Sequence, residues 1–164
     1  SVGRLRTQGY LEALEAHKMV ADSNLILKID DSLDVENNLD VLETEIAQFL
    51  KTNPKIDGLF AVNELYAVSA MKVAKKLGFN IPDDIQVIGF TDGVLSKHAS
   101  PSLTTVSQHG QKIGEQASNL LIDRLEAEDA EIDQYLSSNE RKPSYIKMVI
   151  ETEIIEREST KAKK

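Results

Sequence analysis

Apolar residues along the chain follow two patterns: stripes at helical spacing and short unbroken runs. Helical spacing is clearest over Asn38–Lys51, where leucine, isoleucine and phenylalanine recur every three or four positions. The same spacing predicts helices over Arg6–Val20, Leu65–Leu77 and Gln111–Glu126. Gly78 directly follows the helix that ends at Leu77, in the position where a left-handed residue commonly terminates a helix.

The unbroken apolar runs predict strands. Leu25–Ile29, Gly58–Val62 and Gln86–Phe90 are short and nearly continuous in apolar residues, as is typical of strands buried on both faces of a parallel sheet. Thr104 and Thr105 favour a further short strand by propensity. Because helices alternate with these runs, we expect an α/β fold with a parallel sheet flanked by helices.

The last part of the chain is more polar. Glu126–Lys142 is acidic and predicts a loop, and Ile146–Ile155 predicts a final extended stretch. The tail Lys161–Lys164 is expected to fray.

Composition narrows the class of protein. The 164 residues are enough for one domain with its own core, and 41% hydrophobic with 5% aromatic residues suits an aliphatic α/β core. A net charge of -8 makes the chain a poor candidate for holding a polyanion by itself. The absence of cysteine excludes disulfides and thiolate metal sites. No apolar run approaches the length of a membrane span, and the first residues lack the apolar region of a signal peptide.

Polar residues directly follow two of the predicted strands: Asn63 and Glu64 after one, Thr91 and Asp92 after the other. Ligands in open α/β sheets bind beyond the carboxyl ends of the strands, so these side chains are candidate ligands. An asparagine amide donates and accepts, as a sugar hydroxyl requires, and carboxylates accept hydroxyl protons. Arg6, near a helix start, offers a planar fork that bridges two vicinal hydroxyls or a carboxylate.

Each candidate also has a structural alternative. Asn63 is equally well placed to cap the helix that follows it. Asp92 with Gly93 forms an ordinary turn dipeptide, and Arg6 suits a surface salt bridge. The residues alone leave both interpretations open.

Motifs for catalysis and metal binding are missing. Asp83 and Asp84 follow a proline and predict a turn rather than an acid–base pair. The aspartates of residues 30–34 lack the glycine and the closing glutamate of a calcium loop. The three histidines are scattered, and there is no HExxH, GxSxG, P-loop or GxGxxG sequence. We therefore expect no metal site, no cofactor and no enzymatic activity.

Three motifs in a fixed order carry a family resemblance. They are IDGLFAVNELYAVSAM from Ile56, LGFNIPDDIQVIGF from Leu77 and SPSLTTVSQ from Ser100. Together with the opening Arg4-x-Arg6-x-x-Gly9 and the close Glu156-Arg157-Glu158-Ser159, they resemble the effector-binding core of lactose/galactose-repressor-type transcription regulators. That core shares its fold with periplasmic sugar-binding proteins, and the resemblance covers nearly the whole chain.

The resemblance implies an incomplete two-lobe core of the type I periplasmic-binding-protein-like kind. Residues 1–99 would form its C-terminal lobe, and 100–128 a crossover with a returning piece of the N-terminal lobe. Residues 129–142 would form the acidic polar loop, and 143–164 the return to the C-terminal lobe and the tail. The helix at Gln111–Glu126 would then lack its native sheet, which leaves an apolar stripe exposed to self-association.

The resemblance also implies a function. The chain would be the effector-binding part of a cytoplasmic, homodimeric repressor whose small-molecule effector is a sugar. Operator DNA would be bound only through a missing helix-turn-helix, with no membrane partner. The effector would shift a population between two lobe arrangements, which requires different affinities for the two. The alternative is a solute-binding protein of a sugar transporter, which the LTTVSQ crossover and the E-x-R-x-S ending oppose. An enzyme on a Rossmann-like sheet is a third class.

Site residues follow from the same resemblance. In the family, the arginine of the R-x-x-G helix, the asparagine after the FAxN strand and an acidic residue after the ViGf strand reach into the effector cleft. Arg6 and Asn63 match the first two. Thr91 stands at the third position, with Asp92 one residue later. A threonine hydroxyl supplies no charge, so either Asp92 takes the acidic role or the effector differs.

Overall fold

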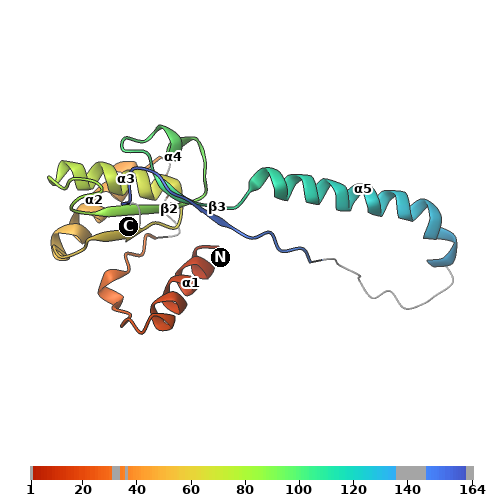
Figure 1. Ribbon diagram of the computed structural model, residues 1–164, viewed down its shortest axis with the longest axis horizontal. Coiled ribbons are helices and arrows are strands. Elements are labelled where there is room, and N and C mark those ends of the chain that lie inside the picture. The colour runs from red at the N-terminus through yellow and green to blue at the C-terminus, as the bar shows by residue number, and fades with distance from the viewer. Residues whose placement is uncertain (1, 31–33, 36, 136–146, 162–164) are drawn as a thin grey trace. The chain divides into compact units, whose positions relative to one another are not determined.

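The computed structural model describes residues 2–30, 34–35, 37–135 and 147–161 (Figure 1). The chain divides into two compact units, Ser1–Val106 with Ile154–Lys164, and Ser107–Glu153. The helices and strands are α1 (Val2–Ala16), η1 (Ser23–Leu25, a 3-10 turn), α2 (Leu39–Thr52), β1 (Gly58–Phe60), α3 (Glu64–Lys76), β2 (Gln86–Phe90), α4 (Val94–His98), β3 (Thr104–Ser107), α5 (Gly110–Tyr135) and β4 (Glu153–Ile155).

The strands form one sheet in the order β1-β2-β3-β4. β1 pairs with β2 in parallel, with Gly58 opposite Gln86, and β2 pairs with β3 in parallel, with Phe90 opposite Val106. The predicted parallel pairing of the second and third apolar runs is therefore confirmed, as is the short strand at Thr104. The helix α3 connects β1 to β2, which places the carboxyl ends of both strands at the same edge of the sheet.

The C-terminal segment runs in the opposite direction to β3. The carbonyl of Ser102 accepts a hydrogen bond from the N–H of Ser159, whereas the side-chain Oγ1 of Thr104 accepts one from the N–H of Arg157. From Ser102 to Thr104 the residue number rises, whereas the partner changes from Ser159 to Arg157. The two segments are therefore antiparallel. The sheet is thus mixed at this end, a difference from the purely parallel sheet expected.

The strand expected at Leu25–Ile29 is wrong. Ser23–Leu25 forms a 3-10 turn capped by Asp22, and residues 26–30 have no regular secondary structure. Leu27 and Ile29 are instead partly buried and pack against the core. An apolar run predicts burial, but a strand also needs backbone partners on a neighbouring strand, which no pattern of side chains in the run itself specifies.

The expected loop at Glu126–Lys142 is helical over its first part, because α5 continues to Tyr135. Glutamate and alanine dominate residues 126–130 and both favour helix, so an acidic composition was a misleading sign of a loop. Residues 136–142 lie outside the described part of the chain, as do Ile146 and residues 162–164. The expected extended stretch forms a strand only at Glu153–Ile155.

Two apolar clusters on either side of α3 form the core. The first joins α3 to α2 and the second joins α3 to the sheet; their buried members are Leu42, Ile46, Leu50, Ala70, Val73, Ala74 and Ile85, and Ala67, Met71, Val87 and Leu103 respectively. Gly89 allows α3 to approach β2, because a Cβ there would lie 3.0 Å from Leu103 Cδ2 and 3.1 Å from Ala67 Cβ. Alanines and a glycine therefore set the spacing between helix and sheet.

The end of α3 confirms the predicted left-handed residue. Gly78 has φ +91, its N–H donates to the carbonyl of Lys75, and the N–H of Phe79 donates to the carbonyl of Ala74. This pair of bonds is the Schellman motif, which satisfies two carbonyls at the helix end. The turn predicted at Asp83 and Asp84 is also present.

Candidate functional site

The carboxyl edge of β1 and β2 is covered by α1. Arg6 Nη1 donates to the carbonyl of Val62, just beyond β1, and its Cζ lies 4.0 Å from the ring centroid of Phe90, the last residue of β2. Tyr10, one turn later, stacks on Phe60 with centroids 6.5 Å apart. Burial lowers the pKa of the Arg6 guanidinium. A backbone hydrogen bond, a cation–π contact and a ring stack thus hold α1 over this edge.

Asn63 caps α3, as its structural alternative predicted. Its Oδ1 accepts from the N–H of Tyr66 at 2.8 Å, and its backbone is extended, as an N-cap requires. Within the described residues, its amide nitrogen has no protein hydrogen-bond partner. The cap therefore uses the acceptor of the amide and leaves both donors for another group.

Glu64 connects the tip of β1 to the tip of β2. Its Oε2 accepts from the N–H of Gly93 at 3.0 Å and from the N–H and Oγ of Ser96 at 3.2 and 2.9 Å. A Cβ at residue 93 would lie 2.1 Å from Glu64 Oε1, so any larger residue there would displace the carboxylate from its present position. Ser96, which is fully buried, was missed by the sequence analysis, because no local pattern links α4 to a glutamate on another helix.

Thr91 has an unusual backbone. Its φ is +83, in a region that β-branched residues rarely adopt. Its N–H donates to the carbonyl of Val106 on β3 at 3.0 Å, and its carbonyl accepts from Ser96 Oγ at 3.4 Å. The residue itself is exposed, so the strained tip carries its hydroxyl at the surface.

Asp92 is tied to the sheet. Its Oδ1 accepts from Arg157 Nη2 at 2.5 Å and from Thr105 Oγ1 at 3.1 Å, and its Oδ2 lies 4.0 Å from Lys97 Nζ. Burial opposes ionisation, but the hydrogen bonds from Arg157 and Thr105 and the charges of Arg157 and Lys97 outweigh it and lower the pKa of Asp92. The ionised carboxylate therefore stabilises the fold above the ordinary aspartate pKa of about 3.9, and this contribution is lost as the pH falls through the lowered value.

Arg157 comes from the C-terminal E-x-R-x-S segment. Its Nη1 also donates to the carbonyl of Leu103 at 2.7 Å and to Thr105 Oγ1 at 3.3 Å. Arg157 belongs to the family signature, but the sequence alone gives it no role. No spacing rule connects residue 157 with residue 92; only the antiparallel return of the chain brings them together.

The five predicted residues thus meet at one edge of the sheet. Arg6, Asn63 and Thr91 reach it from α1, the β1 tip and the β2 tip. Glu64 and Asp92 reach it too, with one oxygen of each carboxylate held by protein donors. Contact between any of the five and an effector stays a prediction.

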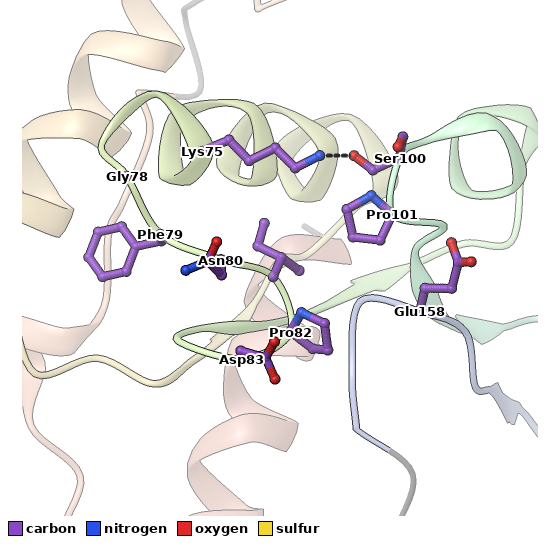
Figure 2. Close-up of a pocket in the computed structure, with 10 residues that line it drawn as sticks. Lys75, Gly78, Phe79, Asn80, Pro82, Asp83, Ser100, Pro101 and Glu158 are labelled. Atoms are coloured by element: carbon purple, nitrogen blue, oxygen red, sulfur yellow. Dashed lines mark hydrogen bonds between the residues drawn. The ribbon is translucent and has the colours of Figure 1, made fainter.

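An open hollow of about 760 Å³ lies elsewhere, beside the loop that leads into β2 (Figure 2). Phe79, Pro82 and Pro101 contribute to its lining, and none of the five predicted residues does. Its three charged side chains are all engaged: Lys75 Nζ donates to the carbonyl of Ser100, Glu158 accepts from Ser102, and Asp83 Oδ1 lies 3.3 Å from Lys161 Nζ. The hollow lies at the entry of β2 rather than at the carboxyl edge, where ligands of such sheets bind.

Within the described ranges, no group of three or more histidines and acidic residues is arranged to hold a metal ion. No helix in the same part of the chain is long and apolar enough to cross a membrane.

Known proteins match the chain along nearly its whole length. The profile of the family described as periplasmic binding protein-like domain matches residues 1–160. The chain is 30% identical over 154 residues to the HTH-type transcriptional regulator CelR of Thermobifida fusca, a match that covers 94% of this chain and 40% of that protein. It is 31% identical over 156 residues to the ribose operon repressor of Halalkalibacterium halodurans, covering 95% of this chain and 40% of that protein.

Solved structures of transcription regulators superpose on the chain. The transcriptional regulator CelR–cellobiose complex superposes with a TM-score of 0.72 at 29% identity, covering 94% of this chain and 41% of that one. A LacI-type transcription regulator from Bifidobacterium animalis subsp. lactis superposes with a TM-score of 0.70 over 99% of this chain and 51% of that one. At 24% identity the second likeness shows the fold alone.

The chain spans about 40% of the length of the curated relatives it matches. The family profile, in contrast, extends over residues 1–160 of 164. The chain belongs to the periplasmic binding protein-like domain family, and its relatives are transcription regulators of the lactose-repressor type.

Proposed function

We propose that the chain is the effector-binding part of a longer DNA-binding transcription regulator, with a sugar as its effector and no enzymatic activity. The convergence of Arg6, Asn63 and Thr91 at one carboxyl edge carries this proposal. The relatives support it, because they are regulators and one of them was solved with cellobiose. A regulator of this kind acts in the cytoplasm as a homodimer.

The free groups at the edge suit a polyol. The Arg6 guanidinium donates to ligand hydroxyls through nitrogens other than the Nη1 that binds the carbonyl of Val62. The Asn63 amide donates twice, and the Thr91 hydroxyl both donates and accepts. Glu64 keeps a second carboxylate oxygen, Oε1, as an acceptor for a sugar hydroxyl. The site therefore offers donors and acceptors in the mixture that sugar hydroxyls require.

We attribute regulation of DNA binding to movement between two lobes of the full-length protein. In this proposal the first compact unit belongs to a C-terminal lobe, and the second, which contains α5, is a returning piece of an N-terminal lobe. The boundary between the two units falls after Val106, inside β3, within the stretch 100–128 that we assign to the crossover and the returning piece. An effector that binds the closed arrangement of the lobes more tightly than the open one raises the population of the closed arrangement. This shift changes the affinity of the dimer for its operator.

Asn63 variants of the full-length regulator test the site. Asn63→Ala removes both the cap and the amide donors, whereas Asn63→Ser keeps a good N-cap and removes only the amide donors. Both variants should weaken effector binding by about 1–3 kcal/mol, because buried sugar hydroxyls lose their partners. Only Asn63→Ala should also lower the free energy of unfolding, by about 1 kcal/mol.

Calorimetric titration with a panel of monosaccharides and disaccharides, cellobiose included, gives the affinities, and urea unfolding gives the stabilities. A serine variant that binds as tightly as the wild type contradicts the role of Asn63. A wild-type regulator that binds no sugar of the panel contradicts the sugar effector.

The chain alone should not bind DNA. It carries a net charge of -8 over 164 residues, whereas affinity for the phosphate backbone comes from clustered lysine and arginine. A duplex pool selected with the full-length regulator provides the operator and the positive control. In gel shifts at physiological salt, the 164-residue chain should leave that operator unshifted, and a sequence-specific shift would overturn the prediction.

A further inference from the structure

The strained backbone of Thr91 is held from both sides. A threonine at φ +83 persists only where the surrounding structure over-determines its conformation. Its own N–H is bound to β3 through Val106, and the next residue, Asp92, is bound through its side chain. The exposed hydroxyl of Thr91 thus sits between two anchored positions at the carboxyl edge.

The side-chain anchor is a single arginine. Arg157 uses Nη2 for Asp92 and Nη1 for the carbonyl of Leu103 and the hydroxyl of Thr105. Its backbone N–H is held by Thr104 Oγ1 at 2.8 Å. The side chains of Arg157 and Asp92 are only 16% and 14% exposed, so both terminal nitrogens of the guanidinium are occupied inside the protein rather than offered to a ligand.

The neighbouring cation does not replace this anchor. Lys97 lies 4.0 Å from Asp92 Oδ2 and its side chain is 58% exposed, which makes it a weak, solvated partner. Without Arg157, Asp92 would keep Thr105 as its hydrogen-bond donor. One hydroxyl and a distant ammonium hold a carboxylate less firmly than Arg157 does, because its Nη2 donates to Asp92 while its Nη1 is anchored on Leu103 and Thr105.

We propose that Arg157 is a positioning residue for effector recognition: through Asp92 it holds Thr91 in its left-handed conformation, so that the Thr91 hydroxyl contacts the effector. This inference rests on the proposed function of the carboxyl edge. It assigns the direct contact to Thr91 and an indirect role to Asp92. The C-terminal segment, far from the edge in sequence, thereby sets the shape of the effector site.

The first arm of the test needs no effector. In the full-length regulator, the ¹³Cα and ¹³Cβ chemical shifts of Thr91 report its backbone conformation. They should indicate a left-handed residue in the wild type and move toward ordinary extended or helical values in Arg157→Gln. Glu158→Gln, on the same segment but away from the edge, should leave them unchanged. A folded Arg157→Gln variant with an unchanged Thr91 conformation overturns the positioning role.

The second arm measures coupling with the tightest-binding sugar of the panel, cellobiose being the first tried. Arg157→Gln and Thr91→Ala should each weaken binding about tenfold, and the double variant should lose little more than either single one. Arg157→Lys, which keeps the charge but not the fork, should recover only part of the affinity. An arginine that serves stability alone would lower the urea midpoint and give losses that add to those of Thr91→Ala.

The outcomes separate the two proposals. Unchanged affinity in Arg157→Gln, with Asn63→Ser still weakened, overturns the role of Arg157 and leaves the effector site standing. A wild-type regulator that binds no sugar of the panel overturns the sugar effector, and with it the assignment of Thr91 as a sugar contact. Non-additive losses together with a changed Thr91 conformation support both proposals.

Discussion

Ser159→Ala is expected to lower the free energy of unfolding by about 2–5 kcal/mol, although it removes a single oxygen atom. Ser159 is fully buried. Its Oγ accepts from the N–H of Thr104 on β3 at 2.8 Å and donates to the carbonyl of Val87 on β2 at 2.6 Å. Alanine would leave both backbone groups buried without a partner, and an unsatisfied buried group costs about 1–3 kcal/mol.

Ser102→Ala is the matched control. Ser102 also uses its hydroxyl, but toward Glu158 at the exposed surface, where water replaces the lost bond and the expected cost is below about 0.5 kcal/mol. Urea unfolding of the chain followed by circular dichroism measures both variants. If Ser159→Ala unfolds at the same urea concentration as the wild type, the bridge between β2 and β3 has no energetic importance.

Amide exchange in α5 should be on the order of a thousandfold faster than in α3, the second large effect. In α3, the residues that face α2 and the sheet are buried, so its amides exchange only when the core opens. In α5, the apolar stripe is solvated: Ile113, Leu121 and Leu125 are 45%, 59% and 56% exposed. A helix without a packed apolar face is marginal in water and opens locally.

Hydrogen exchange on the dilute 164-residue chain, with its monomeric state checked by sedimentation, measures the difference. Replacing Leu121 and Leu125 by glutamine should leave the urea midpoint of the chain unchanged, whereas Met71→Gln in α3 should lower it. Equal protection of α3 and α5 in a monomer would contradict the prediction and show that the apolar stripe of α5 has an adequate partner.

The spacing of apolar residues was sufficient to predict a helix that packs on one face. The helices around Asn38–Lys51 and Leu65–Leu77 begin and end within one residue of the predicted bounds. Their stripes are the faces that form the core, so the pattern and the packing have the same physical origin. The left-handed Gly78 was predictable for a similar reason, because the steric freedom of glycine is a local property.

The pattern of apolar residues was insufficient where the structure of a segment depends on hydrogen bonds to residues far away in the sequence. The run Leu25–Ile29 is apolar enough for a strand, yet it is irregular because its backbone takes part in no ladder. The short helix α4 was not predicted, since its first turn is satisfied by Glu64 from another element rather than by a local cap. Both cases depend on hydrogen bonds between residues that are far apart in the chain.

The sequence by itself determined the strand–helix alternation, the parallel pairing of two runs and the placement of Asn63, Glu64, Thr91 and Asp92 at strand ends, because hydrophobic period and strand polarity are local properties. Only the tertiary structure decided what each side chain does there. It directs one oxygen of Glu64 and one of Asp92 into the protein and brings Arg157 across β3 to Asp92. Among the described residues, it uses only the acceptor of the Asn63 amide. The reason is physical: a hydrogen bond between residues 92 and 157 depends on the antiparallel return of the chain, which no local spacing encodes.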